Sequence, residues 1–260
     1  MQTIITSKNN PFIKEAVSLK DKKGRKERGL FLAEGEKMTA ECLAAHRRIG
    51  RVFFAENYAG KYAERIRSLL KENGVAEDKI IRVSQAVFDC ISEEKTPQGV
   101  LCEVKIPENK PKPPEGDALL LDGVADPGNL GTIIRTANAA GFNEIYLVNC
   151  ADAYSPKCVR ASMSGIFFTL PYSVSREEAL RLLRGVPVVA ADMGGQNVFS
   201  FSAPEKIALA VGNEANGLSE EVRRAAAYTV SIPMRAAQES LNAGVAAAVC
   251  MYALRRDKFV

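Results

Sequence analysis

The chain has 260 residues, 47% hydrophobic and 25% charged, which is the composition of a folded globular protein and excludes wholesale disorder. Its length fits a small domain joined to a medium one. The net charge of +4 is too small to indicate nucleic-acid binding by itself, but the charge is unevenly distributed. Residues 1–107 carry 20 Lys and Arg against 15 Asp and Glu, whereas residues 117–260 carry 13 against 14.

Several classes of protein are excluded early. The N-terminus lacks the apolar segment of a signal peptide, and the longest small-apolar run, residues 243–254, is too short to span a bilayer. We therefore expect a cytoplasmic protein. The six cysteines form no C-x-x-C pair and His46 is the only histidine, so we expect no metal site, no disulfide framework and no histidine-dependent hydrolase.

The N-terminal part, residues 1–105, reads as a small α/β domain. Asn10-Pro11 is typical of a helix start and precedes an apolar stripe at helical spacing. Further helices are predicted over residues 36–46 and 59–72. Short strands are predicted over residues 29–33, 51–55, 79–83 and 99–104.

The segment 106–116, IPENKPKPPEG, contains four of the 12 prolines. Such a composition favours extended conformations, so we interpret it as a semi-rigid linker. A second domain, residues 117–260, follows it.

The second domain alternates apolar strands and helices, which predicts an open, mostly parallel sheet covered on both faces. Its helix over residues 239–254 has Leu241, Val245, Val249 and Tyr252 at helical spacing, and we expect this face to pack on the sheet. Ligands of such sheets bind beyond the carboxyl ends of the strands. The strands are predicted over residues 118–122, 144–148, 186–191, 206–211 and 228–232, and the other helices over residues 132–140, 176–183 and 219–227.

Three loops after strands carry unusual residues. The first loop is DGVADPGNLGTIIRT, residues 122–136. Its glycines allow close backbone approach, and the free amide groups at the start of the next helix favour binding of an anion such as phosphate, with Arg135 one helical turn further in. A plain strand-turn-helix connection without a ligand is equally consistent with this segment. In VGNEANGL, residues 211–218, the carboxylate of Glu214 is either a hydrogen-bond acceptor for a ligand or a helix cap. The third loop is SIPMRAAQESLNAGVAA, residues 231–247. Its small residues either allow backbone or another chain to approach closely or are simply good helix formers.

No G-x-G-x-x-G occurs, which argues against a dinucleotide-binding Rossmann enzyme. The segments NLGTIIRTANAAGF, VGNEANGL and IPMRAAQESLNAGVAAAV, in this order, resemble the three motifs of the SpoU–TrmH family of RNA 2′-O-ribose methyltransferases, in the SPOUT superfamily. The run YSPKCVRASMSGIFF is similar to the segment between the first two motifs. Ala243 replaces the usual Val, and Ser164-Gly165 replaces Gly-Ser. Upstream, SKNNPFIKEAVSLKDKKGRKERGLFLAEGEK resembles the substrate-binding domain of ribosomal-RNA members.

The resemblance implies an α/β fold whose C-terminal methyltransferase domain contains a trefoil knot, preceded by a small α/β RNA-binding domain. It implies S-adenosylmethionine as cofactor and a homodimer formed through the catalytic domain. By position, the cofactor-binding residues are Gly212, Ile232 and Leu241, with Val211, Met234 and Ala246 nearby.

The family's catalytic residues map onto Asn129, Arg135, Glu214, Ser240 and Asn242. Because a guanidinium is almost never deprotonated in a protein, we expect Arg135 to pair with an RNA phosphate and stabilise the developing alkoxide. Methyl transfer from a sulfonium requires no metal. The substrate implied is ribosomal RNA; a transfer RNA methyltransferase, antibiotic-resistance methylation of rRNA and a non-catalytic RNA-binding or ribosome-assembly factor are alternatives.

The basic cluster over residues 20–28 is expected to contact RNA phosphates through Lys22, Lys23, Arg25 and Lys26. A solvated loop that contacts nothing is the alternative. Charge runs alone do not distinguish the two.

Overall fold

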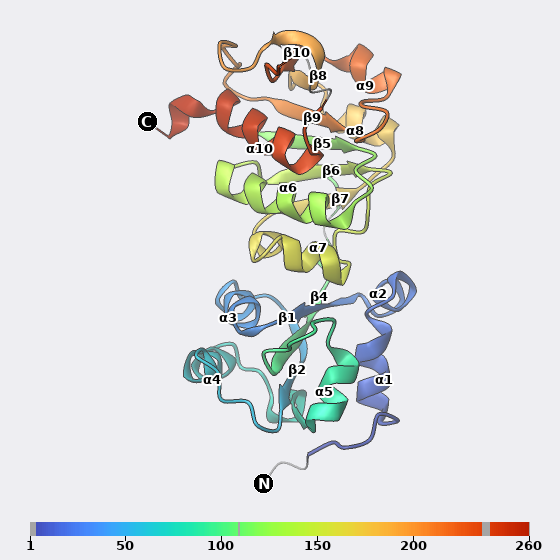
Figure 1. The fold of residues 1–260 in the computed structure, drawn as a ribbon, viewed down its shortest axis with the longest axis vertical. Coiled ribbons are helices and arrows are strands. Elements are labelled where there is room, and N and C mark those ends of the chain that lie inside the picture. Colours follow the sequence, from blue (N-terminus) through green and yellow to red (C-terminus); the bar gives the residue numbers. More distant parts are fainter. Residues whose placement is uncertain (1–3, 109, 236–239, 260) are drawn as a thin grey trace. The chain divides into compact units, whose positions relative to one another are not determined.

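The computed structural model describes residues 4–108, 110–235 and 240–259 (Figure 1). The backbone forms two compact units: residues up to 107 with residues 154–167, and residues 108–153 with residues from 168 onwards. Each unit is an α/β structure with its own sheet and its own buried core. None of the described helices is long and apolar enough to cross a membrane.

The first unit begins with the helix predicted from Asn10-Pro11. The Asn10 side chain accepts a hydrogen bond from the Phe12 N–H at 2.9 Å, and Pro11 occupies the first turn, where no N–H is needed. The elements of this unit are α1 (Pro11–Ser18), α2 (Lys22–Arg28), β1 (Leu30–Glu34), α3 (Glu36–Ala44), β2 (Ile49–Ala55), α4 (Ala63–Glu72), η1 (Glu77–Lys79), β3 (Ile80–Val83), α5 (Gln85–Ile91), β4 (Val100–Lys105), α7 (Pro156–Ala161) and η2 (Gly165–Phe167).

The strands of the first unit pair in the order β1-β4-β2-β3. Strands β2 and β3 are parallel, and β4 is antiparallel to both β1 and β2. All four predicted strands are present. One face of the sheet packs on α1 and α5, where Ile13, Phe53, Phe88 and Leu101 are fully buried. The sequence analysis did not predict α2, α5 or α7.

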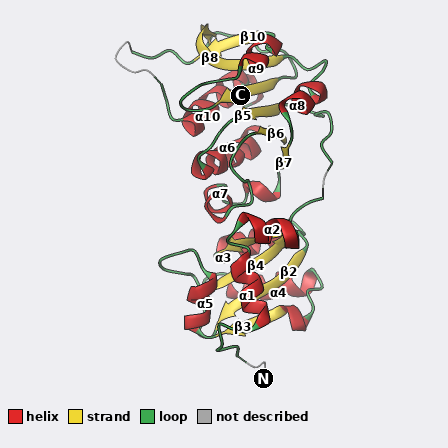
Figure 2. Ribbon diagram, turned by 90° about the vertical axis from the view of Figure 1, so that its right-hand side faces the viewer, coloured by secondary structure: helices red, strands yellow, loops and turns green. Residues whose placement is uncertain are grey.

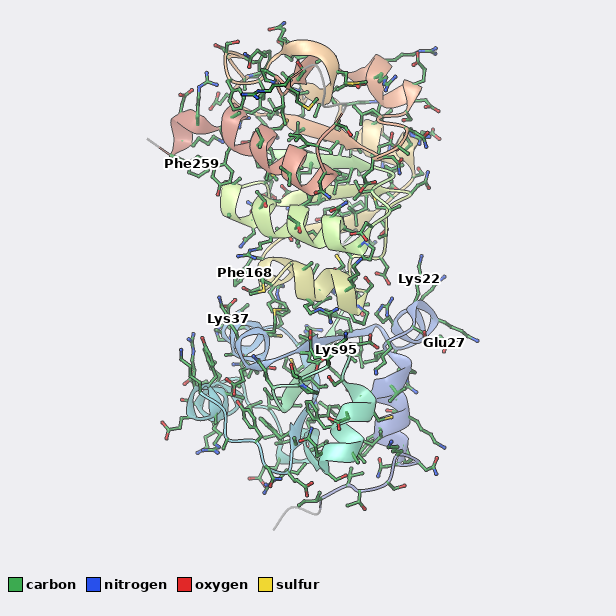
Figure 3. All side chains as sticks on the ribbon, in the orientation of Figure 1. Lys22, Glu27, Lys37, Lys95, Phe168 and Phe259 are labelled. Atoms are coloured by element: carbon green, nitrogen blue, oxygen red, sulfur yellow. The ribbon has the colours of Figure 1, made fainter. Side chains whose placement is uncertain are left out.

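The basic cluster forms the helix α2. Lys22, Lys23 and Lys26 are exposed on it, and Figure 3 shows Lys22 pointing away from the helix. Arg25 differs from them because it is only 4% exposed, and its guanidinium donates to two backbone carbonyl oxygens of the α1–α2 turn at 2.8 and 2.6 Å. Arg25 therefore stabilises this turn, and we correct its assignment as an RNA contact.

The second unit contains a sheet of six parallel strands in the order β10-β8-β9-β5-β6-β7. The mostly parallel sheet that the sequence predicts is thus confirmed. Its elements are β5 (Ala118–Asp122), α6 (Pro127–Ala140), β6 (Glu144–Val148), β7 (Leu170–Ser173), α8 (Arg176–Leu182), β8 (Val188–Asn197), β9 (Ala208–Gly212), α9 (Glu220–Ala225), β10 (Tyr228–Ser231), α10 (Ala243–Leu254) and η3 (Arg256–Lys258).

Helices cover both faces of this sheet. Helices α6 and α10 lie side by side on one face, and α8 and α9 cover the other (Figures 1 and 2). The central strand β5 is buried along its whole length, which explains its continuous apolar sequence. In the register, Asp122 pairs with Val148 of β6 and with Gly212 of β9, while Ala191 of β8 pairs with Val211. The loops that follow these strands therefore meet at one edge.

Helix α10 presents a different face to the sheet from the one predicted. Val245 is 49% exposed and Tyr252 is 43% exposed, whereas small or flexible residues such as Ala247, Cys250 and Met251 are buried. The prediction failed because α10 is apolar on most of its surface, so helical spacing alone does not identify the packed face. The predicted start of this helix, Glu239, lies outside the described residues.

The buried carboxylate of Asp117, just before β5, forms hydrogen bonds with Arg255 and Lys258 after α10. Asp117 Oδ2 accepts hydrogen bonds from Arg255 Nε at 2.6 Å and from Lys258 Nζ at 2.7 Å, and Arg255 also bonds to Oδ1. The Ile207 N–H donates to Oδ1 at 3.0 Å. Burial acts to raise the pKa of Asp117, but the hydrogen bonds from Arg255, Lys258 and Ile207 outweigh it and lower that pKa.

We expect Asp117→Asn to lower the free energy of unfolding by about 3–5 kcal/mol, because it leaves the buried Arg255 without its counter-charge. Urea unfolding near neutral pH measures the loss, with the exposed Asp257→Asn as control. Because the folded-state pKa lies below the unfolded value, this stabilisation is present above the unfolded pKa and is lost as the pH falls through the folded one. A difference between parent and variant that does not shrink in acid would contradict this account.

Candidate cofactor and catalytic site

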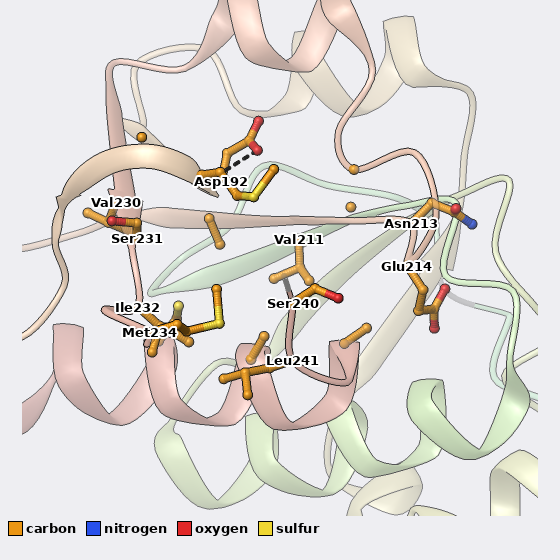
Figure 4. Close-up of a pocket in the computed structure, with 18 of the residues that line it drawn as sticks. Asp192, Val211, Asn213, Glu214, Val230, Ser231, Ile232, Met234, Ser240 and Leu241 are labelled. Carbon is orange, nitrogen blue, oxygen red and sulfur yellow. Dashed lines mark hydrogen bonds between the residues drawn. The ribbon is translucent and has the colours of Figure 1, made fainter. Parts of the chain in front are cut away.

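A cavity of about 880 Å³ opens at the carboxyl ends of β9 and β10, beside residues 191–194 in the middle of β8 (Figure 4). All six residues predicted to bind the cofactor line it: Val211, Gly212, Ile232, Met234, Leu241 and Ala246. They come from the end of β9, from the loop after β10 and from the first turns of α10. The walls are therefore built from apolar side chains and exposed loop backbone.

The sequence analysis missed one wall of the cavity. Strand β8 runs beyond its predicted end at residue 191, and its pairing with β10 shifts register so that residues 191–195 bulge out. Within the bulge Asp192 lines the cavity and pairs with Arg223 Nε at 2.8 Å. Gly194-Gly195 was the available signal, since glycines inside a strand often mark a bulge or a close approach. A Cβ on Gly195 would lie 2.6 Å from the backbone of Thr229.

The loop after β9 is a tight turn held by Asn213. Its Oδ1 accepts hydrogen bonds from the N–H groups of Ala215 and Asn216 at 2.9 and 3.1 Å, and its Nδ2 donates to the Gly123 carbonyl at 2.8 Å. The last bond ties this loop to the one that follows β5. Gly212 packs directly against the backbone of Gly217, so a larger residue would displace the turn.

Three of the predicted catalytic residues form one chain of hydrogen bonds. Asn129 Nδ2 donates to Glu214 Oε1 at 2.7 Å, and Asn242 Nδ2 donates to Asn129 Oδ1 at 2.8 Å. Asn242 Oδ1 in turn caps α10 by accepting from the N–H groups of Gly244 and Val245. The network joins residues that are 85 and 113 positions apart in the sequence. Glu214 lies at the cavity wall, so the network ends there.

Ser240 and Arg135 occupy different positions relative to the cavity. Ser240 lines the cavity (Figure 4). Arg135 lies on α6, is exposed, and forms no hydrogen bond or ion pair within the described part of the chain. It is not among the residues that line the cavity. The structure thus brings Asn129, Glu214 and Asn242 together and leaves Arg135 directed to solvent.

The start of α6 is less favourable to an anion than the sequence suggested. Helix α6 begins at Pro127, five residues before the predicted start, and Asp126 is its N-cap. The Asp126 carboxylate accepts the Asn129 N–H at 2.9 Å. The Asp126 carboxylate thus occupies one of these amides and disfavours a second anion beside it.

We expect Asn129→Asp to reduce activity at least about 10-fold, because it replaces the donor to Glu214 with a second carboxylate at hydrogen-bond distance. Asn138→Asp is the matched control, since Asn138 is exposed on the same helix. Single-turnover rates of both variants measure the effect. Equal rates for the two variants would show that the Asn129 network is dispensable.

The cysteine thiol at the cavity wall is not a nucleophile. Burial raises the pKa of Cys250 to about 12, so the thiol stays protonated near neutral pH. Among the described residues no group of three or more His, Cys, Asp or Glu side chains could hold a metal ion.

The second unit is an α/β fold, with a six-stranded parallel sheet covered by helices on both faces. The cavity lies at the carboxyl edge of the sheet, where folds of this kind bind their ligands. A family model described as the SpoU rRNA Methylase family matches residues 118–252, and one for an MRM3-like substrate binding domain matches residues 10–102. The chain belongs to the SpoU rRNA methylase family.

Relatives of similar length support this assignment. The 23S rRNA (guanosine(2553)-2′-O)-methyltransferase RlmP of Bacillus subtilis is 32% identical over 259 residues, covering 96% of this chain and 98% of that protein. The crystal structure of an AdoMet-bound rRNA methyltransferase from Sinorhizobium meliloti is 31% identical with a TM-score of 0.86 and covers 98% of each chain. AviRb from Streptomyces viridochromogenes, a SpoU methyltransferase in complex with AdoMet, is 26% identical with a TM-score of 0.82, covering 96% of this chain and 99% of that one.

Proposed function

We propose that this protein transfers a methyl group from S-adenosylmethionine to a ribose 2′-hydroxyl of ribosomal RNA. The observation that carries the proposal is the cavity lined by all six expected cofactor residues, next to the network of Asn129, Glu214 and Asn242. The match to AdoMet-bound structures over nearly the whole chain supports the choice of cofactor.

The residues of the cavity fit this cofactor. Apolar side chains such as Val211, Ile232 and Leu241 suit an adenine ring and the methylene groups of the methionine chain, and loop backbone offers hydrogen-bond partners for the polar edge of the adenine. When bound, S-adenosylmethionine supplies a methyl group made electrophilic by its positively charged sulfur. The ribose oxygen would take up that methyl group as its bond to sulfur breaks, and the proton of the hydroxyl would pass to a phosphate or to water.

The protein's own residues position the hydroxyl and stabilise charge. We assign to Arg135 the pairing with an RNA phosphate and the stabilisation of the developing alkoxide, because it is an exposed cation without a protein partner in the described residues. Ser240 at the cavity wall and Asn242 at the start of α10 are placed to fix substrate and cofactor. Glu214 orders the site through Asn129.

We assign substrate recognition to the N-terminal domain, residues 1–105, and methyl transfer to the catalytic domain, residues 117–260; residues 154–167 of the latter pack with the first unit, and residues 108–116 of the predicted linker 106–116 pack with the second. The match of residues 10–102 to a substrate-binding family model supports this division. Lys22, Lys23 and Lys26 of α2 are proposed to contact RNA phosphates, since all three are exposed. Because its substrate would be ribosomal RNA, we place the protein in the cytoplasm.

We also propose that the protein is a homodimer and that its C-terminal region forms a trefoil knot. The exposed apolar side chains of Val245 and Tyr252 on α10 support the dimer, because a partner subunit would cover them. The return of α10 from the outer strand β10 to pack against α6 and β9 supports the knot. Sedimentation velocity at several protein concentrations tests the dimer, and a monomer at all of them would refute it.

Mapping of 2′-O-methyl sites in total RNA with and without the gene tests the activity. We expect one or a few rRNA sites to disappear on deletion and to be restored by the purified enzyme with S-adenosylmethionine, with EDTA having no effect when RNA folding is unchanged. Loss of sites in transfer RNA alone would make the protein a tRNA methyltransferase. Absence of cofactor binding by calorimetry, with RNA binding retained, would make it a non-catalytic RNA-binding factor.

A further inference from the structure

A second basic surface of the first unit is built from segments other than α2. A cavity of about 450 Å³ is lined by loop and strand-end residues of this unit alone. We call it the basic groove and define it by its polar side chains, His46, Arg47, Arg48, Asn73, Lys79 and Lys105. Leu30, Ile49, Val75 and two glycines also line it.

The charged side chains that line the basic groove are all positive. Within the described residues no carboxylate lines it, although Glu77 and Asp78 lie close by in the sequence. Arg47, Arg48 and Lys79 form no ion pair in the described part of the chain. Other cations of this unit do, since Arg51 pairs with Glu103 at 2.8 Å. Three cations without a protein counter-charge in one cavity concentrate positive potential there, which attracts an anion.

The histidine of the basic groove is held in one orientation. Asn73 Nδ2 donates to the carbonyls of Leu43 and Leu69 at 3.1 and 2.8 Å, which fixes its Oδ1 as an acceptor. The His46 Nδ1, 3.0 Å from that oxygen, is therefore the donor, and Nε2 has no partner among the described residues. The His46 backbone has a φ of 51°, a left-handed conformation that is common just after a helix, and α3 has its C-cap one residue earlier at Ala45. The hydrogen bond to Asn73 thus leaves Nε2 as the ring nitrogen that faces a ligand.

We propose that the basic groove binds the phosphodiester backbone of the RNA substrate. This inference rests on the proposed function, which makes RNA the substrate of the protein. The cations come from the turn before β2, from η1 and from the end of β4, so they line the groove from separate segments, as repeated phosphates require. Arginine and lysine side chains supply most phosphate contacts in RNA and DNA complexes.

The test replaces Arg47, Arg48 and Lys79 with glutamine in the full-length protein. Filter binding to a 23S rRNA transcript over a range of KCl concentrations gives the affinity and its salt dependence. Each lost phosphate contact removes about 0.7 to 0.9 from the log–log slope, so we expect a slope smaller by about 2 and an affinity at least about 10-fold weaker. Cofactor affinity measured by calorimetry should stay unchanged.

The matched control replaces Lys8, Lys14 and Arg65 with glutamine. These three residues are exposed on the same unit, lie outside the basic groove, and change the net charge equally. A third variant, with Lys22, Lys23 and Lys26 replaced, measures the contribution of α2 separately. Photo-crosslinking should also map RNA to peptides that contain residues 46–48 and 79.

An equal loss of RNA affinity in the groove variant and the control variant would overturn the proposal, since the net charge of the protein alone would then account for the loss. So would a groove variant that keeps RNA binding but loses an acidic protein partner. Methyl transfer that persists with an unchanged salt slope would refute the basic groove and leave the proposed function intact. A parent protein that binds no rRNA would refute both.

Discussion

Replacement of Arg135 by alanine is expected to reduce methyl transfer by far more than 10-fold while leaving cofactor affinity nearly unchanged. Arg135 is exposed on α6 and has no hydrogen bond or ion pair in the described part of the chain, so removing it costs the fold little. It is not among the residues that line the cofactor cavity, so the cofactor should bind as before. The loss should therefore appear in the chemical step with bound RNA.

Single-turnover methylation and calorimetry with S-adenosylmethionine measure the two quantities separately. Arg184→Ala is the matched control, because Arg184 is an exposed arginine of the same unit outside the site. A rate within 10-fold of the parent, about 1.4 kcal/mol of barrier, would show that the role assigned to Arg135 is wrong.

The second large effect is expected from Gly212→Ala, which should weaken cofactor binding at least about 10-fold. A Cβ atom on Gly212 would collide with the backbone of Gly217 and Leu218, which cannot move without opening the turn held by Asn213. That turn lines the cofactor cavity. Calorimetry measures the affinity, and circular dichroism checks that the variant is folded.

Two further variants keep this prediction falsifiable. Gly116→Ala is the matched control, since a Cβ there meets no atom within 4 Å. Ala246→Leu adds volume at a residue of α10 that lines the cavity, and it should also weaken cofactor binding. Parent-like affinity in both Gly212→Ala and Ala246→Leu would place the cofactor elsewhere.

The sequence by itself predicted most of the strands of both sheets and the loops that line the cavity at the carboxyl edge of the second sheet. Continuous apolar runs such as residues 118–122 and 144–148 identified buried parallel strands, because only strands covered on both faces carry them. The order of the three motifs then identified the loops at the carboxyl edge of the sheet. All six residues selected there line one cavity, since loops after parallel strands meet at the same edge.

Only the tertiary structure decided the contacts that depend on partners distant in the chain. It showed Arg25 buried against backbone carbonyls, Asp126 at the start of α6, and Val245 on the exposed side of α10. It also brought together Asn129 and Glu214, and the cations of the basic groove. A local pattern reports the propensity and period of a segment, but burial and pairing depend on what packs against it, which is a property of the whole fold.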